Sequence, residues 1–600
     1  MTKDDSPQPR WRGLLHKRWP WIILLLAIAF SYYGSYVRYG IGFRDEGQTV
    51  AFGAQRLLNG ELPLKQVVLN YNVLWFYPVV ALFKLFGVSY VLLRGWCLAL
   101  SALTAGLGFL MVEKTTRRPW LAFLVAIVLV LIPGSPFKNY IPLIAVANTL
   151  CLLHVALTPA NSRAAFFKAI AGGAVLGLSF LIRIDIALLF TAIWLLLLVV
   201  RLLAGTAPFA GRALVSIGSL LALAAVAGVL HLPVWIDAKR RGFDREFAAQ
   251  YVEKWRMLER PVTRLLRHRA APKLQPAHAG AHSQIPRRAA LNPAGGDPAG
   301  ADKQTLQRAT WRNWQKVGQN SGPAFVFLCY APLLVVAVLI PWGVFTWVRG
   351  VWRGEREQEE RALGVLVLIG GALSTFPQFF FFRPDVPHLS EFMPGLLVSS
   401  AAAAGLLWCD VSSWRNWRTL FTAFLVAIAA VYVCRILPDR WAGTCAIRNK
   451  RTKFFAAANG VRVFVSSREF TGLTQIKQLV REFAPKPRDF VVCYPYSPGI
   501  NLLANRPTYE RNVYVDNATR TTRWDAEAIA RFEVYRPAVI VLSDWDINGT
   551  DASRFSVWAV KAKTWIQTHY TCQGTYIAGS DAFEIYTREP APPKPSAGGK

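Results

Sequence analysis

The chain has 600 residues, of which 53% are hydrophobic and only 17% are charged, yet its formal net charge at pH 7 is +32. With a mean hydropathy of +0.28, this combination excludes an ordinary soluble enzyme and a disordered chain. The basic residues form short clusters between apolar runs, a pattern that does not predict nucleic-acid binding. We therefore expect a polytopic α-helical membrane protein.

About 11 to 13 spans are predicted from the apolar stretches between residues 19 and 437. Basic residues precede the first stretch, and no cleavage site follows it, so residues 1–18 are expected in the cytoplasm. Alternation of the later basic clusters then places the C-terminal segment outside. The stretch 73–88 is interrupted by Pro78 and Lys84, and we expect it to be re-entrant or interfacial.

Three segments outside the spans have different characters. Residues 38–72 form a first outer loop, and residues 237–322 form a long outer loop whose middle is rich in Ala, Pro and Gly and is expected to be disordered. Residues 438–588 show α/β patterning, with strands expected at 461–466, 490–493, 538–543 and 583–586 and helices at 473–483 and 525–535. A small extracytoplasmic α/β domain is predicted, followed by a disordered tail at 589–600. Cys445, Cys493 and Cys572 lie on that side, and their odd number leaves the disulfide pairing open.

The first outer loop carries an acidic pair, Asp45 and Glu46, a few residues after the first span. Carboxylates beside a membrane are costly unless they are paired or used. In one interpretation Asp45 only caps a helix over residues 47–58, a role that its residue type suits. In the other, the pair is catalytic.

The surroundings of this pair carry a resemblance. A short helix ending in Leu57-Leu58-Asn59-Gly60 and Pro63 follows it, then an aromatic segment with Tyr71 and Trp75, then Lys84-Leu85-Phe86-Gly87 and Arg94. Over residues 20–200 the chain resembles the C-type membrane glycosyltransferases, most closely the branch of protein O-mannosyltransferases and lipid A aminoarabinose transferases. The resemblance implies a sugar donor linked to polyprenyl phosphate, inversion at the anomeric carbon, and action of Asp45 on an acceptor hydroxyl.

Basic residues at the outer membrane face are the candidate ligands of the donor phosphate. Arg183 lies between two apolar runs, and it either pairs with Asp185 or, as the resemblance implies, binds the lipid phosphate with Asp185 orienting it. Lys138 lies on the same face.

A second candidate phosphate site is the turn that holds Arg383, Asp385 and His388. Arg383 can engage phosphate while Asp385 orients His388, unless the turn only ends a span.

One departure from the family bears on the acceptor. The aminoarabinose transferases carry an acidic residue shortly after the position of Lys138, but residues 141–149 contain none and offer only Asn148, which argues against lipid A. The acceptor is left as a glycan, lipid or protein. No spacing of metal ligands predicts a metal site, and a need for a divalent metal is left open.

We thus expect an enzyme of the bacterial inner membrane with its α/β domain in the periplasm. The alternatives are a transporter or flippase for lipid-linked sugars, or a non-catalytic assembly subunit.

Overall fold

The computed structural model describes most of the chain, and the account that follows is confined to these residues. They are 17–43, 47–69, 71–131, 138–159, 162–203, 208–268, 322–376, 386–408, 419–434, 452–515, 523–546, 551–578 and 581–588. The predicted disordered tail and the middle of the long outer loop fall outside these ranges.

Six of the described helices are long and apolar enough to cross a membrane. They are α2 (Arg18–Arg38), α5 (Tyr90–Thr116), α8 (Arg163–Ile182), α9 (Ile184–Leu203), α10 (Phe209–Arg241) and α13 (Gly322–Arg353). Four further described helices belong to the bundle: α6 (Pro119–Leu131), α7 (Tyr140–Ala156), α14 (Arg356–Leu373) and α16 (Val386–Trp408). The apolar helix Thr419–Cys434 packs there as well. Apolar side chains such as Leu196 and Leu214 point outward, 64% and 76% exposed, as expected for a lipid-facing surface. The chain is a multi-pass membrane protein.

Glycines bring α8 and α10 into direct backbone contact. A Cβ at Gly173 would lie 2.8 Å from the Cα of Leu223, and one at Gly177 would lie 2.8 Å from the Cα of Ala227. Small residues four apart on one face allow membrane helices to pack closely, because van der Waals contact replaces the hydrophobic effect inside a bilayer. After this crossing the chain turns at Gly242 into α11 (Asp244–His268), which packs against α9 and α10.

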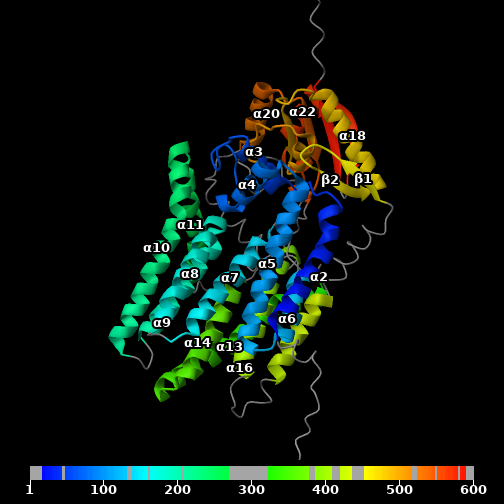
Figure 1. Cartoon of the computed structure of the whole chain (residues 1–600). Coiled ribbons are helices and arrows are strands. Elements are labelled where there is room, and N and C mark those ends of the chain that lie inside the picture. The colour runs from blue at the N-terminus through cyan, green and yellow to red at the C-terminus, as the bar shows by residue number, and fades with distance from the viewer. Residues whose placement is uncertain are drawn as a thin grey trace, which may run out of the picture.

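The first outer loop forms short helices at one end of the bundle (Figure 1). The helix expected over residues 47–58 is divided into a π-helix, η1 (Gly47–Phe52), and an α-helix, α3 (Gly53–Leu58). The aromatic segment then forms a 3₁₀ turn, η2 (Val73–Trp75), and α4 (Tyr77–Phe86). Ten helical residues rise only about 15 Å, so α4 is too short to cross the hydrocarbon core.

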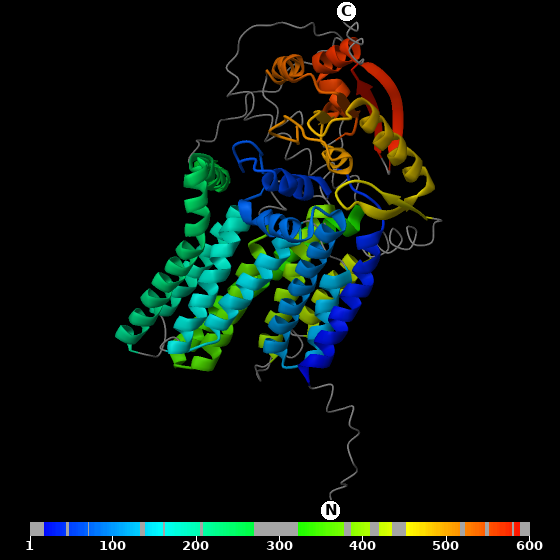
Figure 2. The ribbon, with the colours of Figure 1, turned by 45° about the horizontal axis from the view of Figure 1, so that its top comes forward.

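The C-terminal residues form an α/β domain above this loop (Figure 2). A four-stranded sheet has the order β3-β4-β6-β5, with β3 (Val491–Tyr494) and β4 (Val539–Ser543) parallel and β5 (Thr571–Ala578) and β6 (Asp581–Thr587) antiparallel. A separate hairpin pairs β1 (Thr452–Ala456) with β2 (Arg462–Ser466). The helices are α18 (Ser467–Phe483), α19 (Gly499–Ala504), α20 (Trp524–Tyr535), α21 (Phe555–Trp558) and α22 (Val560–His569), with a 3₁₀ turn, η4 (Asp551–Ser553). Cys493 is buried and Cys572 exposed, both as free thiols, and Cys445 lies outside the described residues.

A network of hydrogen bonds fixes this domain to the first outer loop. The buried guanidinium of Arg56 pairs with Glu61 at 2.6 Å and donates to the carbonyl of Glu510 in the α/β domain at 2.8 Å. Arg511 in turn donates to the carbonyl of Leu64 at 2.6 Å and accepts from the backbone N–H of Val68. The loop and the domain therefore form one structural unit.

Candidate functional site

The candidate site begins at the break between α8 and α9, at the end of the bundle that faces the α/β domain. Arg183 has extended backbone there, because its side chain turns to Asp185 in the first turn of α9. Its Nε lies 3.0 Å from Oδ1 of Asp185 and its Nη2 lies 3.2 Å from Oδ2, so the two groups form a parallel fork. The pairing considered from the sequence is confirmed. Within the described part of the chain no hydrogen bond engages Nη1 of Arg183.

Two stacked aromatic rings, those of Tyr71 and Trp75, lie beside the Arg183–Asp185 pair. The Arg183 guanidinium lies 5.6 Å from the ring centre of Tyr71, which stacks on Trp75 at 3.8 Å. Asn72, between them, caps η2 through its side-chain oxygen and donates its backbone N–H to the carbonyl of Ile182 at 3.2 Å. The aromatic segment is therefore tied to the last turn of α8, next to Arg183.

A second ion pair lies within electrostatic range of the first. Lys138, just before α7, pairs with Glu391 on α16 at 2.8 Å, and both side chains are buried. Burial alone would disfavour the charged form of Arg183, but the charges of Asp185 and Glu391 outweigh it and raise the pKa of its guanidinium. The structure thus brings together three of the predicted residues, Lys138, Arg183 and Asp185. Glu391 was not predicted, although a carboxylate inside an apolar stretch is itself a signal of a functional or paired position.

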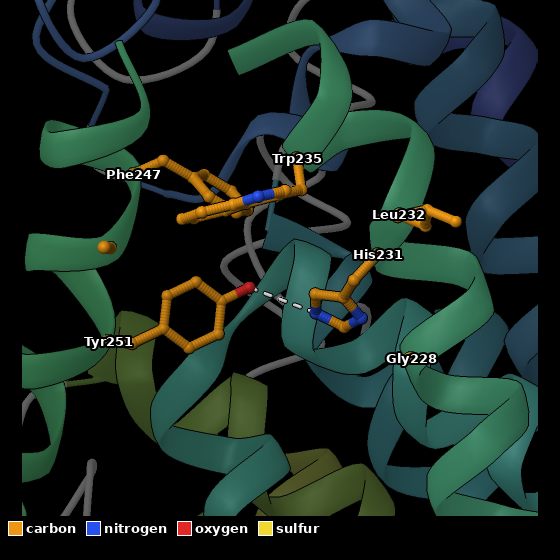
Figure 3. Close-up of a pocket in the computed structure, with 7 residues that line it drawn as sticks. Gly228, His231, Leu232, Trp235, Phe247 and Tyr251 are labelled. Atoms are coloured by element: carbon orange, nitrogen blue, oxygen red, sulfur yellow. Dashed lines mark hydrogen bonds between the residues drawn. The ribbon is translucent and has the colours of Figure 1, made fainter. Parts of the chain in front are cut away.

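An apolar groove between α10 and α11 approaches these charges from the side. It has a volume of about 400 Å³ and is lined by His231 and Trp235 from α10 and by Phe247 and Tyr251 from α11 (Figure 3). The Tyr251 hydroxyl lies 3.1 Å from Nε2 of His231 and accepts from the Asn72 side chain at 3.3 Å. Burial raises the pKa of Tyr251 to about 12, so its hydroxyl stays protonated.

Two elements connect the groove to the Arg183–Asp185 pair: helix α11 and the aromatic segment that contains Asn72. One turn beyond Tyr251, the charge of Lys254 acts on Asp185, so α11 contributes to both places. Asn72 makes the second connection, because it bonds Tyr251 and directly follows Tyr71, whose ring faces Arg183. An apolar groove with the cations Arg183 and Lys254 nearby suits a ligand with a long apolar chain and an anionic head.

Several predicted residues cannot be placed in this arrangement. Asp45, Glu46, Arg383 and Asp385 lie outside the described residues, as does the side chain of His388 on α16. The residues that flank 44–46 are described, and they contact the α/β domain: the carbonyl of Phe43 accepts from the Gly499 N–H at 3.2 Å, and η1 packs on α19. In the described part of the chain, no three His, Cys, Asp or Glu side chains gather as a metal site would require.

No protein-family model and no curated protein matches the chain. Among solved structures, ArnT from Cupriavidus metallidurans bound to undecaprenyl phosphate is 14% identical, with 94% of this chain and 98% of that chain covered and a TM-score of 0.46. The archaeal oligosaccharyltransferase AglB from Archaeoglobus fulgidus, in complex with an inhibitory peptide and a dolichol-phosphate, is 12% identical, with 95% and 74% covered and a TM-score of 0.45.

Proposed function

We propose that the chain is a membrane glycosyltransferase that moves a sugar from a polyprenyl phosphate carrier to an acceptor hydroxyl at the membrane face beneath the α/β domain. The observation that carries the proposal is the apolar groove between α10 and α11, whose Tyr251 is hydrogen-bonded to Asn72, in the segment beside Arg183. A groove of this kind suits an isoprenoid chain, and Nη1 of Arg183, which makes no hydrogen bond to the described residues, suits a phosphate oxygen.

The chemistry requires few groups from the protein. The acceptor oxygen forms a bond to the anomeric carbon while the bond to the phosphate oxygen breaks, with inversion, and the acceptor proton passes to a carboxylate. We assign the role of that base to Asp45, with Glu46 beside it, as the resemblance implies. The departing phosphate needs no general acid, because cations such as Arg183 and Lys138 stabilise its charge. Arg383 and His388 are proposed to contact the donor as well, with Asp385 orienting His388.

The side of action follows from the charge pattern. Because basic residues cluster at the loops expected inside, we place residues 1–18 in the cytoplasm and 438–588 in the periplasm of a bacterial inner membrane. The acceptor is proposed to be a cell-envelope glycan, a glycolipid or a protein that reaches the site from that side.

The competing transporter function would use carboxylates deep within the bundle. Glu391 is a buried carboxylate, but it lies in the second turn of α16 and pairs with Lys138 at the same end of the bundle as Arg183. We therefore count it as part of the proposed donor site.

The test fills the groove without disturbing the packing of the protein. A Cβ at Gly228, which lines the groove, would meet no atom within 4 Å, and the same holds at Gly211 on the same helix outside the groove.

Transfer of a labelled sugar is measured with purified protein and three donors: a long polyprenyl phosphate sugar, the same sugar on a short-chain phosphate, and a nucleotide sugar. We expect transfer from the long-chain donor alone. Gly228→Leu should raise the KM for that donor at least about tenfold, since it removes roughly 1.4 kcal/mol or more of apolar contact. Gly211→Leu should behave as wild type.

Two outcomes contradict the proposal. Transfer from the nucleotide sugar would remove the lipid carrier from the reaction. Movement of labelled lipid across proteoliposomes without release of polyprenyl phosphate would favour the transporter.

A further inference from the structure

Four basic side chains gather at the opposite end of the bundle from the candidate site. We call Lys114, His154, Lys168 and Arg201, which come from α5, α7, α8 and α9, the basic cluster. Lys168 is 15 residues before Arg183 along α8, so the two positions are about 22 Å apart along the helix axis. The cluster therefore belongs to the other membrane face.

Thr158, which follows α7, holds two of these cations. Lys168 donates to its hydroxyl, and Arg201 donates to its carbonyl and to the carbonyl of Val155, the latter at 2.6 Å. The Thr158 hydroxyl also donates to the carbonyl of His154. Side chains and carbonyls from α7, α8 and α9 thus meet at Thr158, where Arg201 is buried and Lys168 is half-buried between the helices.

The negative charge around the cluster does not match its positive charge. Glu359 and Glu360 of α14 act on Arg201 and offset its charge. Lys114 repels Lys168, and in the described part of the chain no carboxylate pairs with Lys114 or Lys168. The connecting sequences 157–162 and 204–208 also contain no Asp or Glu. Like charges held together between helices are unfavourable unless an anion joins them.

The surface next to the cluster is apolar. Phe167, adjacent to Lys168, is 66% exposed, and Leu203, two residues after Arg201, is 71% exposed. Basic side chains at helix ends with apolar neighbours on the lipid side suit an anionic lipid, since the head meets the cations and the acyl chains meet the apolar residues.

From this geometry we infer that the basic cluster is a binding site for the phosphate of an anionic phospholipid in the leaflet remote from the α/β domain. The general preference for basic residues on the cytoplasmic side explains exposed cations at the ends of the spans, such as Arg118 after α5 and Arg349 near the end of α13. It does not require Arg201 and Lys168 to meet at Thr158 between helices.

The test compares two double variants that each remove two positive charges from this face. The full chain is reconstituted in nanodiscs of phosphatidylcholine alone or with phosphatidylglycerol, and both the thermal midpoint and the lipid retained on native mass spectrometry are measured. Wild type should be stabilised by phosphatidylglycerol and retain it. Lys114→Gln/Lys168→Gln should lose the added stability and retain the lipid about 25- to 36-fold less well, since each lysine near anionic lipid adds roughly five- to sixfold. Arg118→Gln/Arg349→Gln, on exposed positions, should respond as wild type does.

Equal losses in the two double variants would overturn the inference, because surface charge alone would then explain the effect. Stabilisation of wild type by inorganic phosphate in phosphatidylcholine, equal to that given by phosphatidylglycerol, would replace the lipid by a soluble anion and overturn it as well. If a variant unfolds too early for a midpoint, its lipid retention relative to the control decides the question.

Discussion

Arg183 either binds the donor phosphate or serves only its partner Asp185, and two substitutions separate these roles. Arg183→Ala and Asp185→Asn break the same ion pair, so a purely structural pair predicts similar effects from both. If Arg183 holds phosphate, only Arg183→Ala removes a ligand, whereas Asp185→Asn leaves the guanidinium and releases its Nε and Nη2. A hydrogen bond to a charged group contributes about 1.5 to 3 kcal/mol. Arg183→Ala should therefore weaken donor binding roughly 10- to 150-fold, and Asp185→Asn should leave it unchanged or tighter.

The assay is binding of polyprenyl phosphate and the KM for the lipid-linked donor, measured at a temperature where all variants are folded. Arg18→Ala is the matched control, because Arg18 forms an ion pair with Glu113 at 2.9 Å near the other end of the bundle. We expect it to leave donor binding unchanged. Equal weakening by Arg183→Ala and Asp185→Asn would refute the reasoning, since loss of the pair itself would then explain both.

Three further predictions concern the acidic residues and the orientation. Asp45→Asn should lower transfer by about 10² to 10⁴ with no change in thermal midpoint, because Asn caps a helix as well as Asp does; wild-type activity would show a capping role only. Glu391→Gln removes the carboxylate that pairs with the buried Lys138 and should destabilise the protein by about 3 to 5 kcal/mol, measured as a lower thermal midpoint. An unchanged midpoint would mean that the charge of Lys138 is compensated without Glu391. Alkaline phosphatase fused after Arg588 should be active, and an inactive fusion would reverse the proposed orientation.

The sequence predicts the buried strands and helices of the α/β domain well. The run 538–543 is apolar up to its last residue, Ser543, and β4 lies there with all five residues buried in the middle of the sheet. β5 was missed, because its sequence includes Gly574 and polar residues and it forms an edge of the sheet, where most of its side chains are not buried. An edge strand takes its conformation from its partner more than from its own pattern. Here that partner is β6.

The candidate site was predictable only where its residues are neighbours in the chain. Arg183 and Asp185 stand two residues apart at a break between apolar runs, and their pairing was one of the two alternatives that the sequence offered. The partner of Lys138 is Glu391, some 250 residues away, and no local pattern relates the two. The groove was missed for a similar reason, because it forms only when α11 folds back on α10, and periodicity gives the type of a helix without its neighbour.

The α/β domain is attached to the first outer loop on both sides of residues 44–46. On its N-terminal side the carbonyl of Phe43 is bonded to Gly499, and on its C-terminal side Gln55 donates to the side chain of Asn505 at 2.8 Å. Gly499 and Asn505 begin and follow the same short helix, α19, so both ends of the loop segment are anchored to a single rigid element. A group that must meet a reacting atom within a fraction of an ångström gains from such support, because freedom lost on folding is not lost again on binding. The α/β domain thus fixes the residues on both sides of Asp45, the proposed base, without contributing a reacting group itself.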